Sequence, residues 1–277
     1  MKIDIAITVT QRFECLNLLL DILKNNFEND YVTHVFCNLC EDDLASHGDH
    51  IDMSLVDHFH HFPSKCFMRQ DTYADSTSRE LYKRIRPLGL IKNVFSTMSS
   101  KYEVRNFIYT ECDVFPLDEN KYVQFLNASE SSGKTFASYT DQSSPKSRDG
   151  FILMAPIYLP KAHARKVAAA ISEHIYIPNG QCLEGRLLSI MKSSGISLSQ
   201  ITDNFPNFAP EYSEKNRSID TETSHQNNIL NLAKPLCESH ITTGKWVQQV
   251  IDVDELHELS TGNMMLKKKD FDLRYWE

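Results

Sequence analysis

The sequence has no long apolar run. An uncharged stretch such as residues 150–160 is well short of the ~20 apolar residues that span a bilayer, so we expect no transmembrane helix. The opening residues include Asp4 where a signal peptide would be apolar, and no small-residue cleavage site follows. Three consecutive lysines at 267–269 allow at most peripheral contact with an anionic membrane surface. These features predict a cytoplasmic protein.

Basic residues are fewer than acidic residues. The chain carries 29 Lys and Arg against 37 Asp and Glu, which gives a formal net charge of −8 at pH 7. Long-range repulsion would oppose non-specific binding to the phosphate backbone of nucleic acid. We therefore expect no nucleic-acid partner.

A disulfide framework is not indicated either. The cysteines are scattered and odd in number, which is typical of reduced thiols: Cys15, Cys37, Cys40, Cys66, Cys112, Cys182 and Cys237. Cys37 and Cys40 form a Cys-x-x-Cys pair, but no second pair lies at the spacing of a zinc site. We expect two thiols at the end of a buried strand there, not a metal or redox site.

Strand-like and helix-like segments alternate along most of the chain. Leu16, Leu19, Leu20 and Leu23 recur with helical spacing after a β-branched run at 3–10. Further strands are expected at 33–37, 107–110, 135–140 and 150–157, and helices at 77–98, 161–174 and 183–192, with the first of these broken or bent at Pro87. Such alternation predicts an α/β fold in which helices flank a mostly parallel sheet.

The alternation stops near residue 200. Residues 203–228 are polar and contain Pro206 and Pro210, which predicts a long loop or lid. We therefore divide the chain into a core, residues 1–200, and a C-terminal lid and extension, residues 201–277.

The most specific motif is Glu111-Cys112-Asp113, directly after the apolar strand at 107–110. Side chains two apart in an extended chain point the same way, so both carboxylates would stand at the carboxyl edge of the sheet, where open α/β sheets bind ligands. Their oxygens suit Mn²⁺ or Mg²⁺, which can bridge diphosphate oxygens. An acidic turn that merely closes a strand is the alternative.

This motif and the order of elements around it resemble the nucleotide-sugar glycosyltransferases of the GT-A fold, in which Asp-x-Asp follows an apolar strand. The resemblance covers most of residues 3–195. It implies a Rossmann-like GT-A domain that transfers a sugar from a nucleoside-diphosphate sugar to a hydroxyl acceptor, such as a glycan or surface polysaccharide. Glu111 stands where the family has Asp, so it contacts either the cation or the ribose. The nucleotide, the sugar, the acceptor and the stereochemical outcome stay open.

The resemblance also assigns residues to the donor. The segment at 5–12 is similar to the family's first strand and nucleotide-contacting turn, which implies that Thr8, Thr10 and Arg12 bind the nucleotide. In the cluster at 240–246, His240 would complete the metal shell and Lys245 would offset the charge of the leaving group. A structural histidine is the alternative for His240.

Basic residues gather on the helix that precedes the metal strand: Arg79, Lys83, Arg84, Arg86 and Lys92. Arg84 and Lys92 are our candidates for the diphosphate or the donor sugar. A solvated helix face is the alternative for the whole run.

The segment at 180–188 is similar to the helix start that carries the catalytic base in inverting members. Glu184 is therefore the candidate base, although Leu183-Glu184-Gly185 replaces the usual acidic pair. Asp149, at the start of the acceptor-side strand, and Asp141 are the next candidates. An exposed acid favoured by the helix dipole is the alternative for Glu184.

Two other functions compete with sugar transfer. A sugar-nucleotide nucleotidyltransferase would use a glycine-rich phosphate loop after the first strand, but residues 8–12 contain no glycine. A non-catalytic nucleotide-sugar-binding protein is favoured by the departures at Glu111 and around Glu184.

Overall fold

The computed structural model describes residues 1–10, 13–63, 76–112, 114–116, 119–137, 139–141, 150–152, 156–173, 182–200, 233–235, 237–238, 246–250 and 272–276. The predicted loop at 203–228 lies outside these residues. None of the helices that the structure describes is long and apolar enough to cross a membrane.

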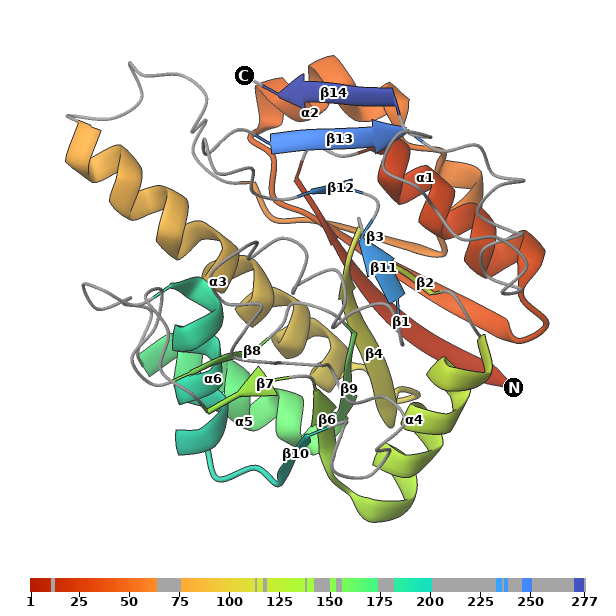
Figure 1. Cartoon of the computed structure of the whole chain (residues 1–277), viewed down its shortest axis with the longest axis vertical. Coiled ribbons are helices and arrows are strands. Elements are labelled where there is room, and N and C mark those ends of the chain that lie inside the picture. Colours follow the sequence, from red (N-terminus) through yellow and green to blue (C-terminus); the bar gives the residue numbers. More distant parts are fainter. Residues whose placement is uncertain are drawn as a thin grey trace, which may run out of the picture.

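A seven-stranded sheet with the order β10-β6-β9-β4-β1-β2-β3 forms the centre of the protein (Figure 1). Strand β9 runs antiparallel to both of its neighbours, and every other pairing in this sheet is parallel. The predicted α/β class with a mostly parallel sheet is therefore confirmed. The strands are β1 (Lys2–Val9), β2 (Asp30–Cys37), β3 (His58–His61), β4 (Asn106–Glu111), β6 (Thr135–Ala137), β9 (Ile157–Pro160) and β10 (Leu198–Gln200).

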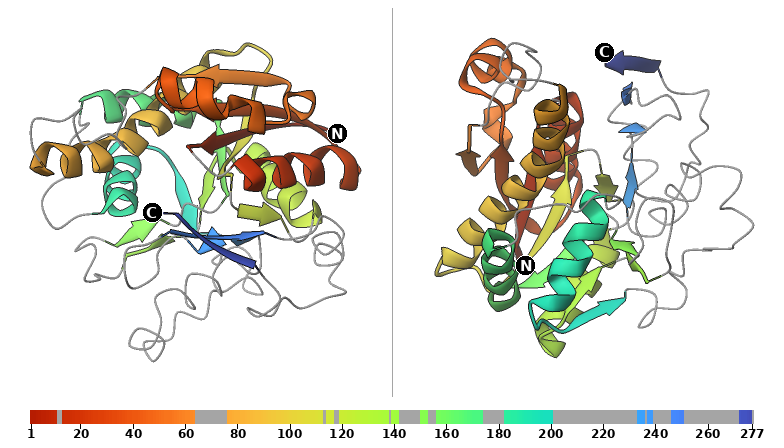
Figure 2. Two further views of the ribbon diagram at one scale, coloured as in Figure 1. Left: turned by 90° about the horizontal axis from the view of Figure 1, so that it is seen from above. Right: turned by 90° about the vertical axis from the view of Figure 1, so that its left-hand side faces the viewer.

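Helices cover both faces of this sheet, and each face has its own apolar core (Figure 2). On one face lie α1 (Phe13–Asp21), the π-helical turn η1 (Ile22–Asn26) and α4 (Glu119–Ser132). On the other face lie α3 (Ser76–Ser100), α5 (Lys161–Glu173) and α6 (Leu183–Ser193). Between β2 and β3 the chain forms α2 (Glu41–His47) and the short turns η2 (Gly48–His50) and η3 (Met53–Leu55).

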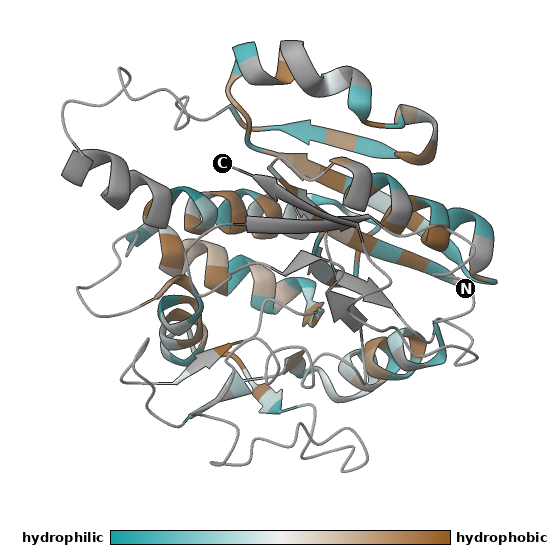
Figure 3. Cartoon of the chain, turned by 45° about the horizontal axis from the view of Figure 1, so that its top comes forward, coloured by the Kyte–Doolittle hydropathy of each residue, from teal (hydrophilic) through white to brown (hydrophobic). Residues whose placement is uncertain are grey.

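Strand β1 shows why the central strands need apolar residues on both sides. Ile3, Ile5 and Ile7 face the core under α1 and α4, while Ala6 faces the core under α3 and α5. The central strands are accordingly largely hydrophobic (Figure 3). The predicted leucine stripe of the first helix is confirmed, because Leu16, Leu19, Leu20 and Leu23 are all buried.

Helix α3 is continuous from Ser76 to Ser100, so of the two predicted outcomes at Pro87 a break is wrong, and a bend stays a prediction. Proline in a helix interior costs roughly 3 kcal/mol. Burial of the following apolar residues offsets that cost, since Leu88, Ile91 and Val94 belong to the core against the sheet.

Two predicted strands are each divided in the structure. The stretch at 135–140 contributes β6 to the main sheet and β7 (Tyr139–Thr140) to a separate pair. The stretch at 150–157 contributes β8 (Phe151–Ile152), the partner of β7, and the beginning of β9. Apolar runs signal burial but do not say which sheet a strand joins.

Segments from beyond residue 200 form small sheets. Strand β11 (Ala233–Pro235) pairs with β5 (Val114–Pro116), and β12 (Cys237–Glu238), β13 (Trp246–Val250) and β14 (Asp272–Trp276) pair with one another. The β5–β11 pair joins the C-terminal part of the chain to the strand that follows Asp113 in sequence.

Candidate functional site

The strand order reverses between β1 and β4. The chain passes from β1 outward to β2 and β3, and then returns through α3 to place β4 on the other side of β1. In open α/β sheets, ligands bind outside the carboxyl ends of the strands at such a reversal. The register pairs Thr8 of β1 with Glu111 of β4 at this edge.

Hydrogen bonds connect the strand ends at this edge. The Thr10 hydroxyl donates to Asn38 Oδ1 at 3.0 Å, which joins the chain after β1 to the chain after β2. The Cys112 amide donates to the Thr8 carbonyl at 3.0 Å. The chain at Thr8 and Thr10 is thus hydrogen-bonded to the residues that follow β2 and β4.

Glu111 is half-buried and lies on the same face of β4 as Tyr109. Burial raises the pKa of Tyr109 well above its usual value, and the nearby charge of Glu111 raises it further. The Tyr109 hydroxyl lies 3.5 Å from Thr8 Oγ1. The buried Tyr109 phenol is therefore neutral. It lies near the Glu111 carboxylate and the Thr8 hydroxyl.

Several predicted site residues cannot be placed. Asp113, Arg12, Asp149, His240 and Lys245 lie outside the described residues. Within the described part of the chain, no group of three or more His, Cys, Asp or Glu side chains could hold a metal ion. The metal site at Glu111 and Asp113 therefore stays a prediction.

A strand from the C-terminal part of the chain, β11, pairs with β5, the strand that follows the Glu111-Cys112-Asp113 motif in the sequence. In the antiparallel β5–β11 pair, Pro235 lies opposite Val114, the residue that follows Asp113. The predicted ligand His240 comes five residues after Pro235 in the sequence. The strand pairing is therefore compatible with a metal shell shared by the two halves of the chain.

Among the basic residues of α3, Arg86 has a partly buried guanidinium group. Its Nε and Nη1 atoms are buried. Burial raises the pKa of the Cys37 thiol, and the charge of Arg86 partly opposes that rise, so the guanidinium lies near the carboxyl end of β2. For Arg84 the structure describes only the helical backbone. Lys92 is half-buried and lies about 9 Å further along the helix axis, away from this edge.

Sequence reasoning did not select Arg86, Asn38 or Tyr109. No local pattern separates Arg86 from Arg84, because each stands four residues before a buried leucine, Leu90 and Leu88 respectively. Asn38 is 3% exposed, but a single polar residue after a strand gives no signal of burial.

Glu184 lies in the first turn of α6, a helix that begins at the same carboxyl edge because it leads directly into the parallel strand β10. The Cys182 side chain caps the start of this helix, because its Sγ accepts a hydrogen bond from the Gly185 amide at 3.3 Å. Burial and the charge of Glu184 raise the pKa of Cys182 to about 11, so the capping group is the thiol. Glu184 itself is half-buried.

Asp141, the further candidate base, is exposed and forms an ion pair with Lys192 of α6. This ion pair directs the Asp141 carboxylate toward α6.

The cysteines differ in one respect from the expectation of reduced thiols. Cys37, Cys112 and Cys182 carry free thiols, as expected, but Cys40 is disulfide-bonded. The prediction is therefore wrong for Cys40. Sequence spacing could not reveal this, because disulfide formation depends on which distant cysteine the fold brings near.

Neither a protein-family model nor a curated protein sequence matches this chain.

Proposed function

We propose that this chain is a metal-dependent glycosyltransferase of the GT-A type, which moves a sugar from a nucleoside-diphosphate sugar to a hydroxyl group of a glycan. The observation that carries the proposal is the pairing of Thr8 with Glu111 at the point where the strand order reverses. This is the position at which an open α/β sheet holds a nucleotide, and Glu111, the first residue of the Glu111-Cys112-Asp113 motif, ends β4 there.

In this proposal Thr8, Thr10 and Arg12 hold the nucleoside. The Thr10–Asn38 hydrogen bond fixes the shape of that subsite before the donor arrives. Arg86 adds a positive charge to the same edge from α3, in the role for which the sequence suggested Arg84 and Lys92. A guanidinium suits a diphosphate because its N–H groups match paired phosphate oxygens.

The carboxylates of Glu111 and Asp113, completed by His240, are the proposed ligands of Mn²⁺ or Mg²⁺. Glu111 fits that role because it offers a half-buried carboxylate, the oxygen donor that hard divalent cations prefer. When bound, the cation would neutralise negative charge on the departing nucleoside diphosphate. Lys245 is proposed to stabilise the same charge.

Glu184 is the proposed general base of an inverting transfer, with Asp149 as the next candidate. Its carboxylate would take the proton of the acceptor hydroxyl as the hydroxyl oxygen bonds to the anomeric carbon. The bond from that carbon to the diphosphate oxygen breaks, and the electron pair leaves with the nucleoside diphosphate. The start of α6 at the carboxyl edge supports this role.

The two remaining parts of the proposal follow from the resemblance to the GT-A enzymes. We propose that the acceptor belongs to a surface polysaccharide and that the transfer takes place in the cytoplasm. Residues 201–277 would complete the site from the C-terminal side, for which the β5–β11 pairing is the structural support.

A donor screen tests the function. The purified full-length chain is incubated with individual UDP-, GDP- and dTDP-sugars, each with and without Mn²⁺, and the melting temperature is measured. Donors that stabilise the chain are then assayed for release of the nucleoside diphosphate in the presence of mixed glycan acceptors. We expect Mn²⁺-dependent stabilisation and release with one donor class. Stabilisation without release from any donor would support the non-catalytic binding protein, and no stabilisation by any donor would contradict both.

A further inference from the structure

Five rings from β2, β3 and the residue after β3 form a continuous stack: His34, Phe36, His58, His60 and Phe62. Each ring contacts the next across the two strands. The ring centroids of His34 and His58 are 4.6 Å apart with an interplanar angle of 14°, and those of Phe36 and His60 are 4.5 Å apart with an angle of 20°. His34 and His60 are 6.1 Å apart. Three imidazoles thus share one small region of the sheet.

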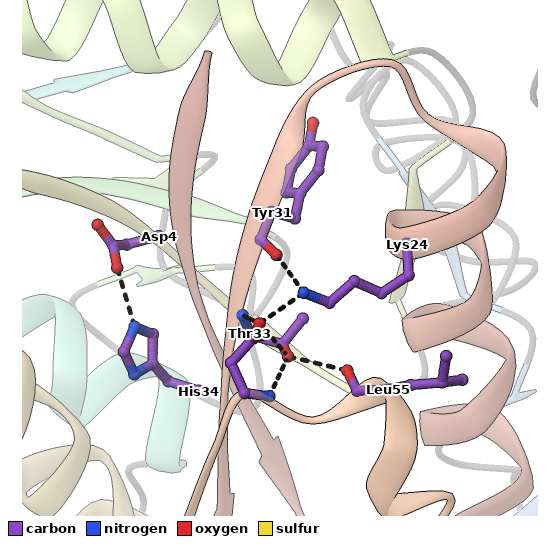
Figure 4. Close-up of polar contacts among 7 residues, drawn as sticks. Asp4, Lys24, Tyr31, Thr33, His34 and Leu55 are labelled. Atoms are coloured by element: carbon purple, nitrogen blue, oxygen red, sulfur yellow. Dashed lines mark hydrogen bonds and ion pairs between the residues drawn. The ribbon is translucent and has the colours of Figure 1, made fainter.

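The deepest of these imidazoles has a charged partner. His34 is 1% exposed, and its Nε2 lies 2.9 Å from Asp4 Oδ1 on β1 (Figure 4). Its Nδ1 and the Nε2 of His60 are both buried and have no hydrogen-bond partner among the residues that the structure describes. A proton added at either nitrogen would therefore gain no hydrogen bond from these described residues.

Charged groups act on the stack from three neighbouring segments. Asp4 on β1 and Asp57, directly before β3, both favour protonation of His58. Lys101, which follows α3, opposes protonation of His58 and His60. Burial, then Lys101 and the other imidazoles, lower the pKa of His60 to about 4, and burial and His34 lower the pKa of His58.

Strand β3 is a short strand at one edge of the main sheet. It has four residues and pairs with β2. Beyond the strand, the Phe62 amide donates to the Cys37 carbonyl at 2.9 Å, and His61 Nε2 lies 2.9 Å from the Leu39 carbonyl. Through these contacts β3 supports the segment that carries Asn38.

We propose that β3 is an acid-released edge strand, which separates from β2 when His58 and His60 of the stack take up protons. Only one carboxylate, that of Asp4, is hydrogen-bonded to an imidazole of the stack among the described residues. Further protons would place like charges on rings that are in contact, and repulsion between them opposes the pairing of β3 with β2. Release of β3 would also loosen the segment around Asn38 at the candidate site.

The direction of the pH effect follows from His60. Its pKa in the closed strand lies below the ordinary value of about 6.5, so the open state binds more protons than the closed state. The closed state is therefore favoured above about pH 6.5 and loses that advantage as the pH falls toward 4. Between pH 8 and pH 5 we expect the opening equilibrium of β3 to rise about tenfold.

Hydrogen exchange of the full-length chain tests the proposal. Protection factors of the amides in β1, β2 and β3 are measured at pH 8 and pH 5. We expect protection in β3 to fall about tenfold at pH 5 while β1 keeps its protection. A fall that is equal in β1 and β3, or no fall in β3, would overturn the proposal. This measurement uses no nucleotide, so its outcome is independent of the proposed transferase activity.

Matched variants identify the groups responsible. His60→Asn and His58→Asn each remove one titrating ring, and we expect each to reduce the pH dependence of β3 protection severalfold. His58 has an exposed side chain, so its replacement keeps the experiment informative if His60→Asn fails to fold. His50→Asn changes an exposed histidine outside the stack and should leave the pH dependence unaltered. A pH dependence that both stack variants retain in full would contradict the proposal.

Discussion

A single half-exposed carboxylate, that of Asp57, joins three separate segments of the chain. Lys24 donates to Asp57 Oδ2 at 2.5 Å and to the Tyr31 carbonyl at 2.6 Å, and the Thr33 amide donates to Asp57 Oδ2 at 2.7 Å. Thr33 also donates to the Leu55 carbonyl at 3.0 Å (Figure 4). Burial alone would raise the pKa of Asp57, but the hydrogen bonds from Lys24 and Thr33 outweigh it and lower the pKa.

This lowered pKa predicts a stability effect of defined sign. The folded state holds Asp57 ionised, so the contribution is present at neutral pH and is lost as the pH falls below about 4. We expect Asp57→Asn to lower the free energy of unfolding at pH 7 by about 1 kcal/mol, reduced from larger values because the carboxylate is partly solvated. Urea unfolding at pH 7 and pH 3.5 checks this. Asp30→Asn, at an exposed position, should have little effect, and equal losses in both variants would contradict the assignment.

Glu184 gives the residue-level test of the chemistry. Glu184→Gln keeps the size of the side chain and removes the base, so we expect donor binding to persist and turnover to fall about 10²–10⁴-fold. Steady-state kinetics with the donor found by the screen, together with donor binding by calorimetry, separates the two effects. Glu173→Gln on α5 is the control at an exposed position. Unchanged turnover in Glu184→Gln would direct attention to Asp149.

At this scale the sequence predicts part of the candidate site. Thr8, Thr10 and Glu111 could be found because they lie at or directly after the ends of apolar strands, and strand ends define the ligand edge. Arg86 could not be separated from Arg84 without the packing of α3, since the useful face of a helix is the one that meets the sheet. The approach of Asn38 to Thr10 depends on the pairing of β1 with β2 and has no local signal.

Secondary-structure elements were more predictable where their periodicity was strong. Helix α5 spans Lys161–Glu173 and α6 spans Leu183–Ser193, close to the predicted bounds of 161–174 and 183–192. Helix α4 was not predicted, although Tyr122, Phe125 and Leu126 are buried in the core. The mostly apolar run at 122–126 is short and flanked on both sides by polar residues, so the sequence signal is weak and tertiary packing decides.

The turn from α4 to β6 provides a test at the scale of elements. Gly133 has φ = 65°, and a Cβ added there would meet no atom within 4 Å. The cost of Gly133→Ala therefore comes from the backbone conformation alone, and we expect a loss of roughly 1–2 kcal/mol in the free energy of unfolding.

Chemical denaturation of matched variants measures this cost. Gly133→Asn should lose less than Gly133→Ala because asparagine tolerates the left-handed region. Gly48 has φ = −62°, so Gly48→Ala should change stability little. If Gly133→Ala and Gly48→Ala are equally stable, the proposed left-handed turn is contradicted.

For the whole molecule, the sequence predicts the fold class but not the strand order. Alternation of strands and helices indicates a mostly parallel sheet, yet the antiparallel direction of β9 depends on pairings between residues far apart in the chain, such as Phe107 with Leu159. The same is true of the β5–β11 pair, which brings Pro235 opposite Val114. Local patterns contain no information about these partners.

The central claim is that Asp113 and Glu111 bind a cation that holds the nucleoside diphosphate at the reversal between β1 and β4. Calorimetric titration of UDP and of GDP into the full-length chain, with Mn²⁺ and with EDTA, tests it most directly. We predict that Mn²⁺ tightens binding of one of the two nucleotides at least about tenfold, that Asp113→Asn abolishes this gain at an unchanged melting temperature, and that Asp141→Asn retains it. Equal affinity with and without Mn²⁺, or an undiminished gain in folded Asp113→Asn, would contradict the account.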